Sequence, residues 1–156
     1  MARFSEGEPL HWTTHIVTGA ALGYLIDRPV QAALVGVGSH IVLDTIPHYD
    51  PDSELGYVID ALLGVLTLTF IAGSKTIRGI DGRHALLWGA IGGALPDTEL
   101  LVNLVENVEP EQYVFPSHDG TLPHLQTGLV ASTVIQAALV TVLMMLARHK
   151  RRMDRA

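Results

Sequence analysis

Histidine and aspartate side chains recur at helical spacing in two parts of this sequence. His11 and His15 are four residues apart, and so are His40 and Asp44. Residues four apart on an α-helix share a face and lie about 6 Å apart along its axis, which suits ligands of one metal ion or of neighbouring ions. The chain has no cysteine, so imidazole nitrogen and carboxylate oxygen are the ligands on offer. The pairs predict a metal site, with zinc favoured by ligand type and manganese or iron also compatible.

Five apolar stretches must position these residues, and turn-forming or charged residues separate them. We predict an all-α fold, a single helical membrane domain over residues 1–156 with a basic C-terminal tail at 148–156. The helices are expected at 15–26, 30–46, 55–73, 84–105 and 122–147, the last with Thr121 as N-cap and Pro123 in its first turn. About twenty apolar residues span a bilayer, and 55–73 and 122–147 fit this length best. The prediction is a transmembrane bundle of about five helices.

Charge is sorted between alternate loops of this predicted bundle. With the C-terminus inside, nine of the ten basic residues fall on the cytoplasmic side, and Arg3 is the exception. Because Lys and Arg concentrate in cytoplasmic loops, we expect a multi-pass protein of the cell (inner) membrane whose C-terminus is cytoplasmic. Residues 1–10 are polar and acidic, so no cleavable signal peptide is expected. The net charge of -6 argues against nucleic-acid binding.

The same threading gathers the polar residues of the helices at the extracytoplasmic face of the membrane. An ionisable group inside a membrane is costly and usually faces a partner or a water-filled cavity, which favours His40 and Asp44 as ligands. The predicted metal ligands are His15, His40, Asp44, His48, Asp97, His118 and His124.

Two carboxylates are candidates to take a proton from water, Asp60 and Glu99. Asp60 and Asp97 have other roles open to them, such as capping a helix, pairing with a histidine or orienting one. Solvation at a helix mouth is the preferred interpretation of His11, Glu99 and Asp119. Glycine runs predict close helix contacts at Gly19/Gly23, Gly36/Gly38 and Gly89/Gly92/Gly93.

Three short motifs carry a family resemblance. His40-Ile-Val-Leu-Asp44-Thr-Ile-Pro47-His48 resembles the His-x-x-x-Asp…Pro…His signature of the zinc-dependent phospholipase C and P1-type nuclease superfamily. Leu95-Pro96-Asp97 and His118-Asp119-Gly-Thr-Leu-Pro-His124 resemble elements of predicted inner-membrane metal-dependent hydrolases, the LexA-binding YdjM-like family, and His15 fits the first histidine of that family. Asp97-Thr98-Glu99-Leu100 stands where that family commonly has Asp-x-Asp-His. The resemblance implies an all-helical domain with a multinuclear zinc centre that cleaves phosphoester bonds.

These features lead to one preferred function and two alternatives. The preferred function is a membrane-embedded, metal-dependent hydrolase that uses metal-activated water on phosphoesters such as a phospholipid or a polyprenyl phosphate. The first alternative is a non-catalytic metal-binding or metal-transporting membrane protein, although the inner halves of the third and fifth helices offer few polar groups for transport. The second is a structural membrane partner whose histidines only form hydrogen bonds. A homo-oligomer stays open.

Overall fold

The computed structural model describes residues 12–49, 54–78, 82–100, 109–123, 125 and 127–153 of the 156-residue chain. Within these residues every element longer than an isolated bridge is helical, which confirms the all-α prediction for this part of the chain. The α-helices are α1 (Trp12–Ile26), α2 (Pro29–Asp44), α3 (Glu54–Gly73), α4 (Lys75–Arg78), α5 (Arg83–Ala94) and α6 (Leu129–Met153). Two short 3-10 helices, η1 (Pro96–Thr98) and η3 (Pro110–Gln112), lie between α5 and α6.

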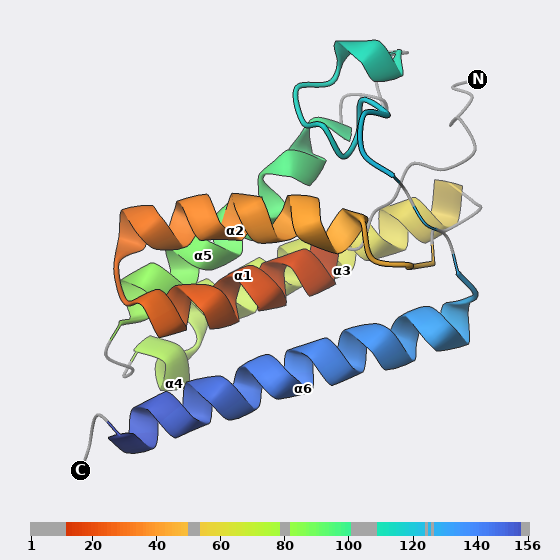
Figure 1. Cartoon of the computed structure of the whole chain (residues 1–156). Helices are drawn as coiled ribbons and strands as arrows, with labels where there is room; N and C mark the ends of the chain where they lie inside the picture. The colour runs from red at the N-terminus through yellow and green to blue at the C-terminus, as the bar shows by residue number, and fades with distance from the viewer. Residues whose placement is uncertain are drawn as a thin grey trace.

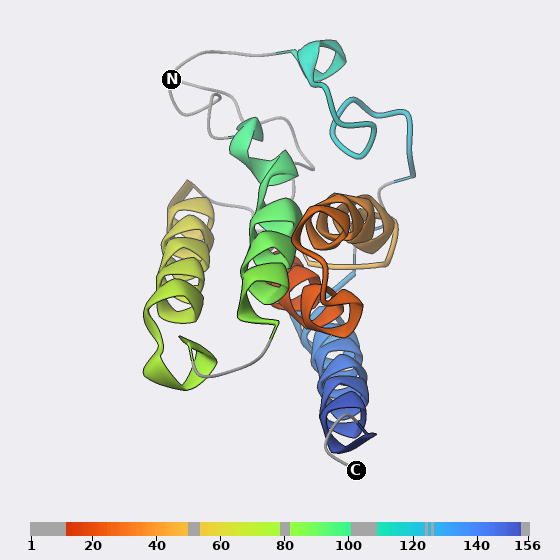
Figure 2. The same cartoon turned by 90° about the vertical axis from the view of Figure 1, so that its left-hand side faces the viewer.

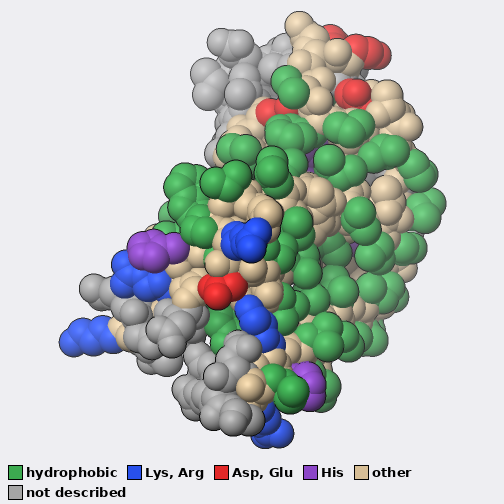
Figure 3. Space-filling model, turned by 60° about the vertical axis from the view of Figure 1, so that its left-hand side comes forward, with side chains coloured by type: hydrophobic (Ala, Val, Ile, Leu, Met, Phe, Trp, Pro, Cys, Tyr) green, Lys and Arg blue, Asp and Glu red, His purple; other side chains and the backbone are tan. Residues whose placement is uncertain are grey.

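The long helices alternate in direction along the chain (Figure 1). The ends of α1, α3 and α6 therefore lie at the same end of the molecule as the starts of α2 and α5. Basic residues belong to these termini and to α4, and we call this region the basic end; among them are Arg28, Lys75, Arg83, Arg148, Lys150 and Arg152. Figure 3 shows Lys and Arg side chains in the lower half of one face of the molecule, with hydrophobic side chains over much of the remainder.

Helices α1, α2 and α5 form the most closely packed part of the fold. A Cβ atom built on Gly36 of α2 would overlap the backbone of Gly89 and Gly93 in α5, and one on Gly19 of α1 would overlap Gly89 as well. Small residues allow such backbone contact between helices. The predicted close contacts are confirmed at Gly19, Gly23, Gly36, Gly89, Gly92 and Gly93. The prediction is wrong for Gly38, whose Cβ would meet no described atom within 4 Å.

Helices α3 and α6 flank this trio on different sides (Figure 2). On the α3 side, the Trp12 ring packs against Gly64, and its indole N–H donates to the carbonyl of Ala94 in α5 at 3.0 Å. On the α6 side, Thr14 donates a hydrogen bond to the Gln136 amide oxygen. At the basic end, Lys150 donates to the carbonyls of Tyr24 and Leu25 at 3.2 and 3.0 Å, in the last turn of α1.

Large hydrophobic side chains are exposed along α2, α3 and α6. Among the described residues, one helix is long and apolar enough to cross a membrane, at Val130–Lys150 within α6, and few residues of its most apolar stretch are buried. Helices α1, α2 and α5 have 15, 16 and 12 residues, fewer than the roughly 20 that a span needs. The structure therefore supports one candidate span where five were predicted.

Two predicted helix boundaries are wrong. The fourth apolar stretch gives an α-helix that ends at Ala94, and Pro96 then opens η1. The fifth helix begins at Leu129, so Thr121 and Pro123 lie in the preceding loop and not at its N-terminus. Proline cannot donate a backbone hydrogen bond, so it is found both in loops and in the first turn of helices. Pro96 and Pro123 therefore did not distinguish between the two.

Candidate metal centre

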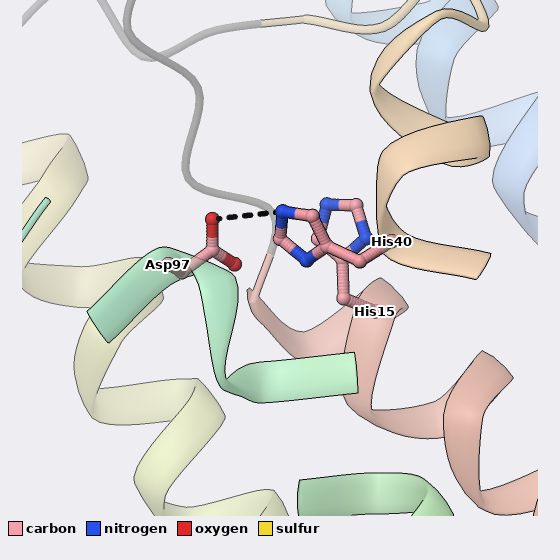
Figure 4. A group of neighbouring side chains, drawn as sticks. All are labelled: His15, His40 and Asp97. Atoms are coloured by element: carbon pink, nitrogen blue, oxygen red, sulfur yellow. Dashed lines mark ion pairs between the residues drawn. The ribbon is translucent and has the colours of Figure 1, made fainter. Parts of the chain in front are cut away.

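The centre begins with three side chains from the first two helices. His40 and Asp44 lie one turn apart on α2, and their Nε2 and Oδ2 atoms are 3.1 Å apart. The other Asp44 oxygen, Oδ1, lies 3.1 Å from His15 Nε2 on α1. The two imidazole rings are stacked, with centroids 3.9 Å apart (Figure 4). Each oxygen of Asp44 thus faces a different histidine.

Two further side chains come from the irregular segments that follow α5. Asp97 of η1 places its Oδ1 3.5 Å from His40 Nε2, the contact drawn in Figure 4, and 3.7 Å from His118 Nε2. His118, from the loop after η3, has its Nε2 3.4 Å from His40 Nε2 and 3.7 Å from Asp44 Oδ2. Nitrogen and oxygen atoms from four segments of the chain therefore converge on one small volume.

Hydrogen bonds on the outer side of two rings set which nitrogen points inward. His40 Nδ1 lies 2.9 Å from the carbonyl of Gly93, and His118 Nδ1 lies 2.7 Å from Glu99 Oε1. A carbonyl or carboxylate oxygen can only accept, so Nδ1 of each ring donates a proton and Nε2 is the nitrogen that faces the centre. Histidine ligands of metal ions are usually oriented by such an outer hydrogen bond. His40 and His118 are both prepared to bind a cation through Nε2.

Glu99 fixes the loop that carries His118. Besides the His118 ring, its carboxylate accepts the backbone N–H groups of Val114 and Phe115 at 2.8 and 3.3 Å. Glu99 was predicted as a catalytic or a solvated residue, whereas the structure places it behind a ligand histidine. The three contacts form only when the loop is folded, so no spacing in the sequence predicts them.

Burial makes the cluster costly without a cation. The side chains of His15, His40, Asp44, Asp97 and His118 belong to residues no more than 8% exposed. Removing carboxylates from water costs several kcal/mol each unless they are paired or bind a metal. Burial raises the pKa of the Asp97 carboxyl well above its usual value, because its charged form loses hydration. Asp97 Oδ2 also has no hydrogen-bond partner among the described residues.

The donor set fits a metal ion. Two overlapping groups, His15/His40/Asp97 and His40/Asp44/His118, each offer three ligand atoms within 4.8 Å of one another. Burial lowers the pKa of His118, which favours the neutral imidazole that binds metals. Mixed imidazole and carboxylate ligands suit zinc and are also accepted by manganese and iron. The structure supports a buried metal site and leaves the identity of the metal to experiment.

Of the remaining predicted site residues, the structure describes His48 and Asp60. His48 is outside both ligand groups, since α2 ends at Asp44; its Nδ1 lies 2.7 Å from the Ile46 carbonyl, and its backbone bonds to Leu125 and Thr127. Asp60 accepts the Trp12 backbone N–H at 3.0 Å and so caps the start of α1 from α3. His11 and His124 lie outside the described residues.

Sequence analysis missed the backbone groups of the centre. The Gly93 carbonyl orients His40, and the Val114 and Phe115 amides hold Glu99. The contact between the Gly93 carbonyl and His40 was indicated in the sequence by the glycine run in α5, which allows the backbone of α5 to approach α2 closely.

Comparison of the chain with protein-family models, with curated proteins and with solved structures finds no match.

Proposed function

We propose that this chain is a membrane-bound hydrolase that cleaves phosphoesters with at least one divalent metal ion, zinc being the ion that its ligands favour. The observation that carries the proposal is the convergence of three histidines and two aspartates in a buried centre, with Nε2 of His40 and His118 aimed inward by outer hydrogen bonds. The resemblance of the segments around His40, Asp97 and His118 to metal-dependent hydrolases supports the same reaction class.

The residues of the centre divide into ligands and a proton acceptor. When a divalent ion is bound, such a site lowers the pKa of a water molecule towards about 7 and stabilises charge on a phosphoryl oxygen. Asp97 Oδ2 would be the oxygen to accept a proton there, because it has no hydrogen-bond partner among the described residues and, unlike both oxygens of Asp44, faces no histidine nitrogen among them. Glu99 and Asp60, the earlier candidates for this role, already accept hydrogen bonds from His118 and Trp12.

A small cavity adjoins the centre at His15. Its volume is about 100 Å³, and His15 and His48 lie in its wall together with Leu43, Gln136 and Leu139. The cavity lies between α1, the end of α2 and α6, so a substrate that approached His15 through it would lie beside the candidate membrane span. This placement favours a phosphoester with an apolar part, such as a phospholipid or a polyprenyl phosphate.

Membrane attachment is supported by the outer surface of the helices. A soluble helix buries its apolar face, whereas α6 is apolar and leaves Val134, Val142 and Met145 at least half exposed. On α3, Leu62, Leu66 and Phe70 are exposed in the same way. We propose that these faces contact lipid, with the basic end in the cytoplasm. The multi-pass arrangement with the centre on the extracytoplasmic side stays a prediction.

Hydrolysis is tested with the full chain in detergent, loaded with zinc and supplied with bis(p-nitrophenyl) phosphate, a phospholipid and a polyprenyl phosphate. We expect turnover of at least one ester that stops with a chelator, returns with zinc and is absent from Asp44→Asn. The matched Asp60→Asn variant keeps the acceptor oxygen for Trp12 and should retain turnover. Metal-loaded protein that cleaves none of the three would contradict the proposal.

A metal centre that only stabilises the fold is the second candidate function. The near-complete burial of the five side chains favours it, because a structural site has no need of an open position. The hydrolysis experiment separates the two functions: a structural centre predicts full metal content in the wild-type chain and no turnover of any ester.

A further inference from the structure

A second cavity lies at the basic end, away from the metal centre. Its volume is about 390 Å³, and its walls come from α1, α3, α4, α5 and α6. Tyr24 in its wall follows His15 by nine residues on α1, which separates the two by about 14 Å along the helix axis. The α1 wall runs from Val17 to Tyr24, and none of the five side chains of the metal centre lines the cavity.

The walls of this cavity are apolar, with cations at one side. Ala21 of α1, Phe70 of α3 and Met144 of α6 line it, and about two thirds of Phe70 and nearly half of Met144 are exposed. Its volume falls within the roughly 300–1,000 Å³ of small-molecule sites, which are mostly apolar with a few placed polar groups. An apolar molecule or chain would fit its interior.

The charged group in the wall of this cavity is basic, beside the hydroxyl-bearing residues Tyr24 and Thr67. Arg148 of α6 is part of the wall. Two residues further along α6, Lys150 donates to the Tyr24 and Leu25 carbonyls and lies 5.6 Å from the centroid of the Tyr24 ring. An ammonium group has three hydrogens, so these two bonds leave Lys150 a third. The guanidinium of Arg148 offers five donors in a geometry that matches phosphate.

We infer that this cavity binds one anionic phospholipid, with acyl-chain carbons among the apolar walls and the phosphate against Arg148 and Lys150. Charge complementarity selects the occupant, because Arg148 is part of the wall of this apolar cavity and Lys150 lies beside Tyr24, another wall residue. An anionic headgroup beside Lys and Arg at a helix end is the usual arrangement at the cytoplasmic leaflet. The bound lipid fills the space between α6 and the rest of the bundle at this end and so holds α6 in place.

The inference is tested by native mass spectrometry of the full chain released from micelles that contain equal amounts of phosphatidylglycerol and phosphatidylcholine. We expect the wild-type chain to retain one phosphatidylglycerol in preference to phosphatidylcholine. Arg148→Gln should bind phosphatidylglycerol about tenfold more weakly, the loss expected for one charge-assisted hydrogen bond. Arg152→Gln removes a charge from the same tail outside the cavity wall and should bind like the wild type.

The apolar part of the site has its own pair of variants. Ala147→Trp fills the cavity from α6 and should abolish retention of the lipid, whereas Ala131→Trp, at an exposed position near the start of the same helix, should not. Thr67→Trp fills the cavity from α3 and gives a second test if α6 does not tolerate the first change. Circular dichroism verifies the helix content of each variant.

Three outcomes would overturn the inference. Equal retention of the two lipids by the wild type would exclude selection by charge. Equal weakening in Arg148→Gln and Arg152→Gln would assign the effect to the whole tail. A chain that elutes as a dimer and carries no lipid would show that a second copy covers the cavity.

Discussion

We expect Asp44→Asn to bind metal at least about 100-fold more weakly than the wild type, the upper end of what the loss of an outer ligand-orienting partner costs. Asp44 touches three histidines of the centre, with an oxygen 3.1 Å from each of His15 and His40 and 3.7 Å from His118. Asparagine keeps the shape of the side chain but removes its charge and replaces one oxygen by a donor nitrogen. Isothermal titration of the full chain with zinc measures the affinity.

The matched control for this prediction is Asp60→Asn. Asp60 is also an aspartate on a helix, but it accepts the Trp12 N–H and belongs to neither ligand group. Its substitution should leave zinc affinity within about threefold of the wild type, because the amide oxygen can still accept that bond. Equal losses in the two variants would mean that Asp44 acts through folding and not as a ligand.

Removal of metal is expected to lower the melting temperature of the wild-type chain. A ligand present at about 1,000 times its dissociation constant stabilises the folded state by roughly 4 kcal/mol. For a chain of this size, that free energy corresponds to roughly 8–16 °C. The stabilisation arises because the bound ion pairs with the buried carboxylates of Asp44 and Asp97 and ties α1, α2, η1 and the His118 loop together.

Differential scanning fluorimetry with and without a chelator measures this change. In Asp44→Asn the shift should shrink to about a third of the wild-type shift or less, because the same metal concentration is then at most about ten times the dissociation constant. Without metal the variant should be no more stable than the wild type, since His15 and His40 lose the carboxylate that both contact. A wild-type melting curve that does not respond to the chelator would contradict the account.

The sequence predicted the half of the centre that depends on helical spacing. His40 and Asp44 share a face of α2 because four residues complete about one turn, and the structure places them in contact. The prediction that successive helices run in opposite directions also placed His15, Asp97 and His118 at the same end of the bundle. Such helices return to one end after every second helix. The glycine runs predicted the close approach of α1, α2 and α5.

The rest of the centre depends on non-helical segments, whose sequences show no periodicity from which contacts can be predicted. Glu99 acquires its place only when the loop with Val114 and Phe115 folds over it. His48 continues the four-residue spacing in the sequence, yet α2 ends at Asp44 and the chain turns to pair with Leu125 and Thr127.

The membrane spans were overpredicted because hydropathy does not report where a helix ends. In α5, twelve residues are followed by Pro96 and a 3-10 turn, so an apolar stretch of spanning length becomes two short elements. The sequence also does not show which face of a helix meets its neighbour, which is why Gly36 and Gly38 were given the same prediction. Both lie on α2, but only Gly36 faces α5, a difference set by the position of the neighbouring helix.

The most direct test of the central claim is X-ray absorption at the zinc edge on the purified full chain. The account predicts at least one ion per chain, with nitrogen and oxygen ligands at about 2.0–2.2 Å, an imidazole contribution and no sulfur. A chain that binds no zinc, manganese or iron after incubation with each would contradict it.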